Sequence, residues 1–171
     1  MKNKYAVLVV DMLNDFVTGA LKCDRGLAIV PKTKELLEGA REKGVPVIFC
    51  NDAHLKDIDH ELKLWGNHAI IGTKGAEVIP ELGLCEKDYV VPKRRYSGFF
   101  QTDLKLLLDE LGVDTVIMTG LHTHMCVRHT SADAYQYGYN VLVAKDATDS
   151  FTEEDYNYGI KYLKDTYGAE I

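Results

Sequence analysis

The sequence lacks any apolar stretch long enough to cross a bilayer. Its first apolar run, residues 5–10, is too short for the core of a signal peptide and is followed directly by Asp11. Together these two absences predict a protein without a membrane partner, and we expect a cytoplasmic location.

An excess of basic residues is also missing. The chain has 20 Lys and Arg against 26 Asp and Glu, which gives a net charge of -6 at pH 7. Because an acidic chain without a basic, aromatic stripe is repelled by phosphate backbones, we expect no nucleic-acid partner.

Paired cysteines and a nucleotide-binding glycine motif are absent as well. The four cysteines, Cys23, Cys50, Cys85 and Cys126, form no CxxC pair, and their spacing fits neither a zinc ribbon nor a disulfide framework. A reducing compartment is the simpler interpretation. No GxGxxG follows the first strand-like run, which disfavours a dinucleotide-binding domain.

What the 171-residue chain does contain is a repeated alternation of strand-like and helical segments. Continuous apolar runs are typical of strands buried on both faces of a parallel sheet. The alternation predicts one three-layer α/β/α domain over residues 1–171 with a mostly parallel sheet. The predicted strands are residues 5–10, 45–50, 89–91, 115–119 and 140–144, and the predicted helices are residues 31–43, 102–111, 126–137 and 153–167.

Residues with reactive side chains follow the ends of several predicted strands. Ligands of open α/β sheets bind beyond the carboxyl ends of the strands, so we expect these residues to converge at one edge of the sheet. They are Asp11, the group Asn51, Asp52 and His54, then Lys93, the segment 120–126, and Asp146.

Cys126 is the candidate nucleophile, because it lies where a strand and a glycine lead into a helix-like segment. A helix N-terminus favours the thiolate, and its free backbone N–H groups can stabilise an oxyanion. Asp11 can accept the thiol proton and return it to a leaving amine, and the charge of Lys93 can hold thiolate and carboxylate together. The alternatives are a buried structural cysteine, a solvated carboxylate and a surface lysine.

The sequence resembles the isochorismatase-like cysteine hydrolases, and within them the nicotinamidase-related branch. The similarity runs from Tyr5 to about Asp149. The segments that carry it, in matching order and spacing, are residues 9–16, 51–54, 65–68, 72–77, 93, 96–99 and 120–127. The resemblance implies a Rossmann-like strand order, a small-molecule amide substrate, and a homo-oligomer, either a dimer or a tetramer.

By this resemblance, Asp11, Lys93 and Cys126 occupy the family's catalytic positions. Family members form a thioester with an amide substrate, release ammonia or an amine, and then hydrolyse the thioester. The resemblance also implies a cis peptide bond between Leu121 and His122, with the backbone N–H groups of His122 and Cys126 as the oxyanion hole.

Asp52, His54 and His68 are candidate metal ligands. Asp52 and His54 are two residues apart, so their side chains share one face of an extended segment, and His68 can approach from the following loop. One divalent ion is expected, with Zn favoured and Fe or Mn as alternatives. From spacing alone, an unrelated acid and two histidines on a polar loop is an equal alternative. His60 is a spare candidate ligand.

The resemblance also assigns Phe16, Trp65 and Tyr96 to an aromatic substrate pocket, for which ordinary core packing is the alternative. His122 and His124 depart from the nicotinamidase pattern, which commonly has alanine and an acidic residue there. Two rings that protonate near neutral pH are expected to line this pocket and to disfavour nicotinamide itself.

The leading hypothesis is therefore a cysteine amidohydrolase that acts on a small carboxamide. A true nicotinamidase and a catalytically silent scaffold or ligand-binding oligomer remain open alternatives. An isochorismatase-type ether hydrolase is disfavoured, because that branch usually lacks the nucleophilic cysteine.

Overall fold

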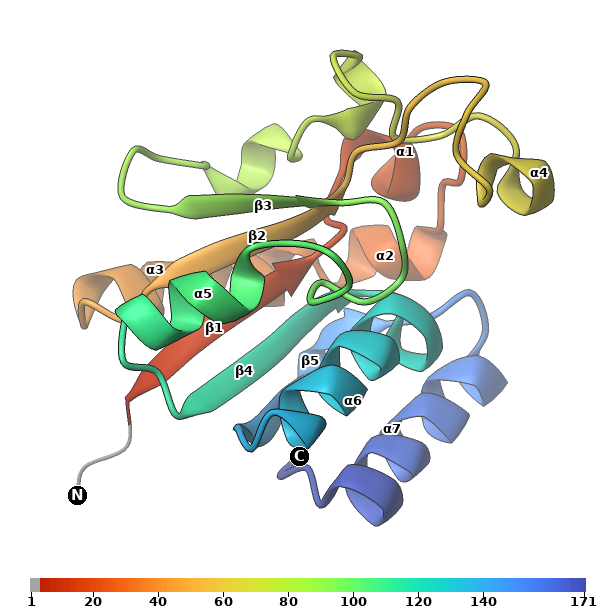
Figure 1. Ribbon diagram of the computed structural model, residues 1–171. Helices are drawn as coiled ribbons and strands as arrows, with labels where there is room; N and C mark the ends of the chain where they lie inside the picture. The colour runs from red at the N-terminus through yellow and green to blue at the C-terminus, as the bar shows by residue number, and fades with distance from the viewer. Residues whose placement is uncertain (1–3) are drawn as a thin grey trace.

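Five parallel strands form the central sheet of the computed structural model, which describes residues 4–171 (Figure 1). The strand order is β3-β2-β1-β4-β5, and every pairing is parallel. The predicted α/β fold with a parallel sheet is thus confirmed. The strands are β1 (Tyr5–Val10), β2 (Val47–Asp52), β3 (Tyr89–Lys93), β4 (Thr115–Leu121) and β5 (Asn140–Asp149).

Helices cover both faces of this sheet (Figure 1). One face carries α1 (Asn14–Val17), α2 (Asp24–Ala28) and α3 (Val30–Glu42), and the other carries α5 (Leu104–Glu110), α6 (Arg128–Gln136) and α7 (Glu153–Tyr167). The short helix α4 (Leu62–Trp65) lies in the long connection between β2 and β3. Within residues 4–171 no helix combines the length and apolar character needed to cross a membrane.

The two faces of the sheet bury separate apolar clusters. In β1, Val7 and Val9 pack toward α3, whereas Ala6 and Leu8 pack toward α5, α6 and α7. All four side chains are fully buried. This double burial explains why the strand is a continuous apolar run and does not alternate with polar residues.

The strand β2 differs from its prediction, residues 45–50, at both ends: it begins at Val47 and continues two residues further, to Asp52. Asn51 and Asp52 pair with Pro92 and Lys93 of β3, so the ladder continues beyond the apolar run. Hydropathy marks the buried part of a strand and misses polar residues that a neighbouring strand holds in register. The extension brings Asp52 beside Lys93.

The segment between β4 and α6 also differs from its prediction. The α-helix expected from residue 126 begins at Arg128, and a π-helical turn, Thr123–Val127, precedes it. In this turn the N–H groups of Met125 and Val127 both donate to the carbonyl of His122, at 2.9 and 3.2 Å. Cys126 therefore lies within a π turn, a feature that often occurs at functional sites.

The chain reverses its direction of travel across the sheet between β1 and β4, which are adjacent. Gly120 of β4 pairs with Val10 and has a φ of +100°. A Cβ atom at this position would lie 2.0 Å from the Val10 carbonyl oxygen, so only glycine lets the strands approach so closely. This is the switch point at which α/β sheets bind ligands, and Asp11 and Cys126 follow its two strands.

Candidate active site and metal centre

The structure brings Asp11, Lys93 and Cys126 together at the carboxyl edge of the sheet. Lys93 Nζ lies 2.8 Å from Asp11 Oδ2 and 3.6 Å from Cys126 Sγ. Each of the three residues is at most 5% exposed. Three residues that are far apart in the sequence thus form one buried, charged cluster.

Asp52 completes this cluster from the end of β2. Its Oδ1 lies 2.5 Å from Lys93 Nζ, and its backbone N–H donates to Asp11 Oδ1 at 2.7 Å. The lysine therefore lies between two carboxylates. An ammonium group in this position offsets the repulsion between two buried anions.

Burial dominates the protonation of the catalytic groups. It raises the pKa of the Cys126 thiol well above its usual value, although the charge of Lys93 opposes this rise. Burial, together with the charge of Asp52, raises the pKa of Asp11 to about 6. Burial disfavours the charge of Lys93 too, but Asp11 and Asp52 outweigh it and raise its pKa. Burial thus opposes the thiolate that the sequence position favoured, so the thiol needs a base.

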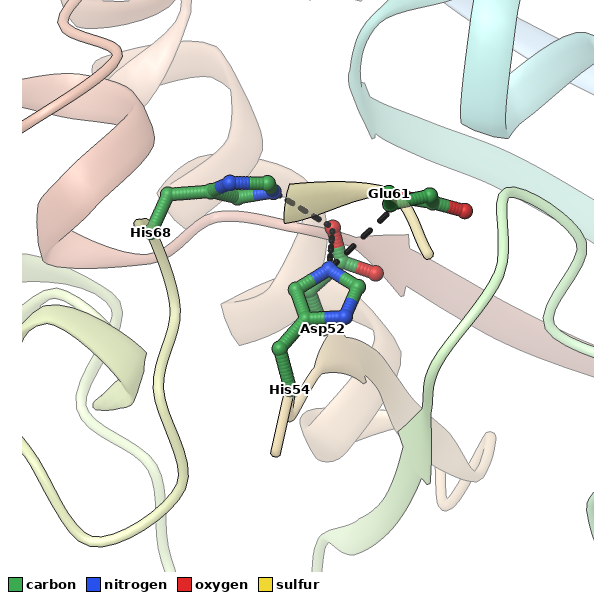
Figure 2. Close-up of side chains that lie close together, drawn as sticks. All are labelled: Asp52, His54, Glu61 and His68. Atoms are coloured by element: carbon green, nitrogen blue, oxygen red, sulfur yellow. Dashed lines mark ion pairs between the residues drawn. The ribbon is translucent and has the colours of Figure 1, made fainter. Parts of the chain in front are cut away.

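A second cluster adjoins the first through the other oxygen of Asp52 (Figure 2). His54 Nε2 and His68 Nε2 lie 3.6 and 3.8 Å from Asp52 Oδ2, and Glu61 Oε2 lies 3.7 Å from His54 Nε2. One ligand atom from each of these four residues lies within 4.8 Å of all the others. The three predicted metal ligands therefore come together, and Glu61 joins them.

The orientation of the two imidazoles fits a metal ion. His54 Nδ1 lies 3.0 Å from Asp59 Oδ2, and His68 Nδ1 lies 2.9 Å from the Gly66 carbonyl, so both Nε2 atoms face the cluster. Within residues 4–171, His54 Nε2 is buried without a hydrogen-bond partner. A tetrahedral site with bonds of about 2.1 Å has ligand–ligand edges of about 3.4 Å, close to the distances here.

Glu61 shows the electrostatic character of this cluster. Burial and the charge of Asp52 raise the pKa of the Glu61 carboxyl to about 7. A cation between these carboxylates would relieve both effects. Two imidazole nitrogens and two carboxylate oxygens are donors that suit Zn, Fe or Mn.

A narrow pocket is lined by Cys126 and by three of the four clustered residues, Asp52, Glu61 and His68. Its cavity volume is about 20 Å³, which is little more than one water molecule. The predicted aromatic residues Phe16, Trp65 and Tyr96 line it together with His122. The peptide bond between Leu121 and His122 is cis, as the family resemblance implied.

His124 lies outside this lining. Its Nδ1 is 2.9 Å from Ser150 Oγ, and its ring is 6.3 Å from that of His122 between centroids. Burial lowers the pKa of His124, and burial lowers the pKa of His122 to about 3. We expected the rings of His122 and His124 to line the pocket and to protonate near neutral pH. The structure places only the His122 ring in the pocket wall, and its low pKa keeps that ring neutral at pH 7.

Comparison with known proteins decides the family. A model of the isochorismatase domain matches residues 5–171. The chain belongs to the isochorismatase family. Among the family's solved structures, N-carbamoylsarcosine amidase from Thermoplasma acidophilum is 38% identical, with a TM-score of 0.91 over 98% of this chain and 94% of that one.

Two further relatives bear on the nicotinamidase-related branch. The structure of a pyrazinamidase from Pyrococcus horikoshii in complex with zinc is 32% identical, with a TM-score of 0.91 over 98% of each chain. An Arabidopsis thaliana protein named "Probable inactive nicotinamidase" is 36% identical over 93% of this chain and 87% of its own. One of these two relatives is named as an amidase and the other as an inactive protein.

Sequence reasoning missed three residues of this isochorismatase-family site. Glu61 directly follows His60, the spare candidate ligand, but His60 is exposed and Glu61 faces the cluster. One step along a helical segment turns a side chain by about 100°, so spacing alone cannot choose between neighbours. Asp59 orients His54, and Phe151 lines the pocket. Both residues lie in loops, where no periodic pattern of apolar residues indicates the direction of a side chain.

Proposed function

We propose that this protein is a cysteine amidohydrolase that cleaves a small carboxamide through a thioester on Cys126. The observation that carries the proposal is the contact of Lys93 with both Asp11 and Cys126 at the wall of a pocket. The relatives named as amidases support it.

In the first half of the reaction, Cys126 Sγ attacks the amide carbonyl while the Asp11 carboxylate accepts the thiol proton. The oxyanion that forms faces the backbone N–H groups of His122 and Cys126. Asp11 then returns the proton to the leaving nitrogen, the C–N bond breaks, and ammonia departs from the thioester.

In the second half, Asp11 accepts a proton from a water molecule that attacks the thioester carbonyl. The C–S bond breaks, the carboxylic acid departs, and the proton on Asp11 returns to the thiolate of Cys126. Lys93 stays protonated throughout, because the two carboxylates raise its pKa. It stabilises the thiolate and fixes the position of Asp11.

Asp52, His54, Glu61 and His68 would hold one divalent ion, for which zinc is favoured. The donor set and the orphaned His54 Nε2 support this assignment, as does the relative crystallised with zinc. When bound, the ion would supply a Lewis-acidic centre beside the pocket. Asp59 and the Gly66 carbonyl orient the two imidazoles.

A non-pyridine carboxamide is the expected substrate, and nicotinamide a poor one. The His122 ring lies in the wall of the pocket, where the nicotinamidase pattern commonly has alanine, so it narrows the space for an aromatic ring. True nicotinamidase activity is the second candidate, because Phe16, Trp65 and Tyr96 form aromatic walls. A nicotinamide kcat/KM at or above about 10⁴ M⁻¹s⁻¹ would favour this second candidate.

The test is ammonia release from a panel of nicotinamide, acyclic amides, ureas and carbamates, with and without a chelator. We expect turnover of at least one acyclic amide and none by Cys126→Ala. The silent-scaffold alternative gains support if no amide is turned over and Cys126 reacts slowly with iodoacetamide at neutral pH. In that case, the proposed mechanism is overturned.

A further inference from the structure

His122 is a buried side chain whose polar atoms have no protein partner. The residue is 2% exposed. Within residues 4–171, neither Nδ1 nor Nε2 of its ring forms a hydrogen bond. Buried polar groups in folded proteins are almost always paired, so an unpaired ring calls for an explanation.

The other histidines that are not exposed each have a hydrogen-bond partner. Nδ1 of His54 contacts Asp59, Nδ1 of His68 contacts the Gly66 carbonyl, and Nδ1 of His124 contacts Ser150. Nδ1 of His129 contacts the Met125 carbonyl. Packing in this fold therefore provides histidine partners elsewhere, and His122 differs from all of them.

Aromatic contacts hold the His122 ring in the wall of the pocket. It stacks on Phe151 with centroids 3.8 Å apart and an interplanar angle of 27°, and it meets the edge of Phe16 at 6.1 Å. Phe16 also contacts the ring of His68, with centroids 5.6 Å apart. Phe16 thus contacts both a candidate metal ligand and the unpaired ring of His122.

The chemistry of the ring defines what it can bind. Burial lowers the pKa of His122 to about 3, so at neutral pH the ring offers one N–H donor and one lone-pair acceptor. Its neighbours Phe16 and Phe151 offer neither. A ligand group with its own donor or acceptor can satisfy the ring, whereas an apolar group leaves it unpaired.

We infer that His122 is the specificity-determining residue of this pocket and hydrogen-bonds to a polar group on the acyl chain of the substrate. The inference rests on the proposed amidohydrolase function. The substrate class is therefore small aliphatic amides that carry a hydroxyl, carbonyl or nitrogen group on the acyl side. Amides with an apolar chain of the same shape are discriminated against, because they bury the imidazole unpaired.

Two pairs of amides test this at constant shape: lactamide against isobutyramide, and 3-hydroxypropionamide against butyramide. In each pair a hydroxyl replaces a methyl group. For at least one pair we expect a preference of about tenfold or more in kcat/KM for the hydroxy compound, mainly through KM. His122→Phe keeps an aromatic ring against Phe151 and abolishes the preference, while the control His124→Phe retains it.

A binding experiment separates this inference from the proposed function. Trp65 is the single tryptophan of the chain and lines the pocket, so its fluorescence reports binding without turnover. We expect Cys126→Ala to bind the hydroxy compound more tightly, and Cys126→Ala/His122→Phe to lose this difference.

If the amides are bound with this preference but none is turned over, the amidohydrolase proposal fails and the role of His122 stands. If amides are turned over with no preference in either pair, or if His122→Phe keeps the preference, the role of His122 is overturned. A water molecule that pairs permanently with the ring would give the same absence of preference and would equally overturn it.

Discussion

The nucleophile cluster and the metal-ligand cluster share Asp52 but balance their charges differently. Asp11, Cys126 and Asp52 surround an internal cation, because Lys93 Nζ lies 2.5 and 2.8 Å from the two carboxylates. The side chains of the metal-ligand cluster include no lysine or arginine, and their facing atoms lie 3.6–3.8 Å apart. In the nucleophile cluster, the ion pairs with Lys93 balance the charge of the carboxylates. The spacing of the metal-ligand cluster fits a bound metal ion that would balance its charge.

The two halves also differ in what holds them. Asp11, Lys93 and Asp52 lie at the ends of neighbouring strands, where the sheet fixes their spacing. Glu61 and His68 come from the connection between β2 and β3 that contains α4. None of the residues of α4 itself is buried. We expect changes in the first half to alter chemistry at constant fold, and changes in the second to alter metal occupancy first.

The largest expected effect is on the nucleophile. Cys126→Ala removes the atom that forms the thioester, so we expect amide turnover to fall by about 10⁴-fold or more. Ammonia release measures the loss, and circular dichroism checks that the fold is kept. Cys85→Ala is the matched control, because Cys85 is exposed. Comparable activity in Cys126→Ala and wild type would place the chemistry elsewhere.

Asp52→Asn is the change that should affect both halves at once. It removes a metal ligand, so metal content should fall from about one ion per chain to near zero. It also removes a charge that raises the pKa of Cys126, so iodoacetamide should alkylate the chelator-treated variant faster than chelator-treated wild type.

His68→Ala is the matched control for Asp52→Asn. It should lose metal equally, but without the change in alkylation, because His68 does not contact Lys93. Identical alkylation profiles for the two variants would show that Asp52 does not couple the clusters.

A smaller effect is expected at Asp59, which contacts a metal ligand without being one. Asp59→Asn weakens the hydrogen bond that orients His54, so metal affinity should drop by about 10- to 100-fold. Competition with a chromogenic chelator measures the change. Asp165→Asn, on the exposed surface of α7, serves as the matched control that removes a carboxylate. An unaltered affinity in Asp59→Asn would exclude this orienting role.

Near pH 7 the smallest expected effect is the dependence of the wild-type enzyme on pH. The base must be a carboxylate, and the pKa of Asp11 is raised to about 6 by burial. As pH falls through this value Asp11 becomes protonated, so kcat/KM should fall by about tenfold per pH unit below it and level off above it. A profile that stays flat between pH 4 and 7 would argue against Asp11 as the base.

The residues at strand ends could be predicted from the sequence. Apolar runs mark buried strands, and the carboxyl ends of parallel strands meet at one edge, so Asp11, Lys93 and Cys126 are brought together by rules that need no side-chain detail. The extension of β2 to Asp52 escaped those rules, because its last residues are polar.

The remaining features depend on tertiary packing. Glu61 and Phe151 lie in segments without periodicity, so their directions follow only from the contacts they make. The direction of the His124 ring is set by Ser150, which is distant in sequence. The protonation of Cys126 and His122 depends on burial, which no local pattern reveals.

The shared carboxylate of Asp52 has a thermodynamic consequence. Its Oδ1 contacts Lys93, and its Oδ2 faces the imidazoles of His54 and His68. Metal binding and the number of protons bound by the nucleophile cluster are therefore thermodynamically linked. Linkage is reciprocal: whatever metal loading does to proton affinity at Asp11 and Cys126, protonation there does to metal affinity by the same factor. Proton release on titration with metal, measured in buffers of different ionisation enthalpy, is therefore a property of the nucleophile cluster as much as of the metal ligands.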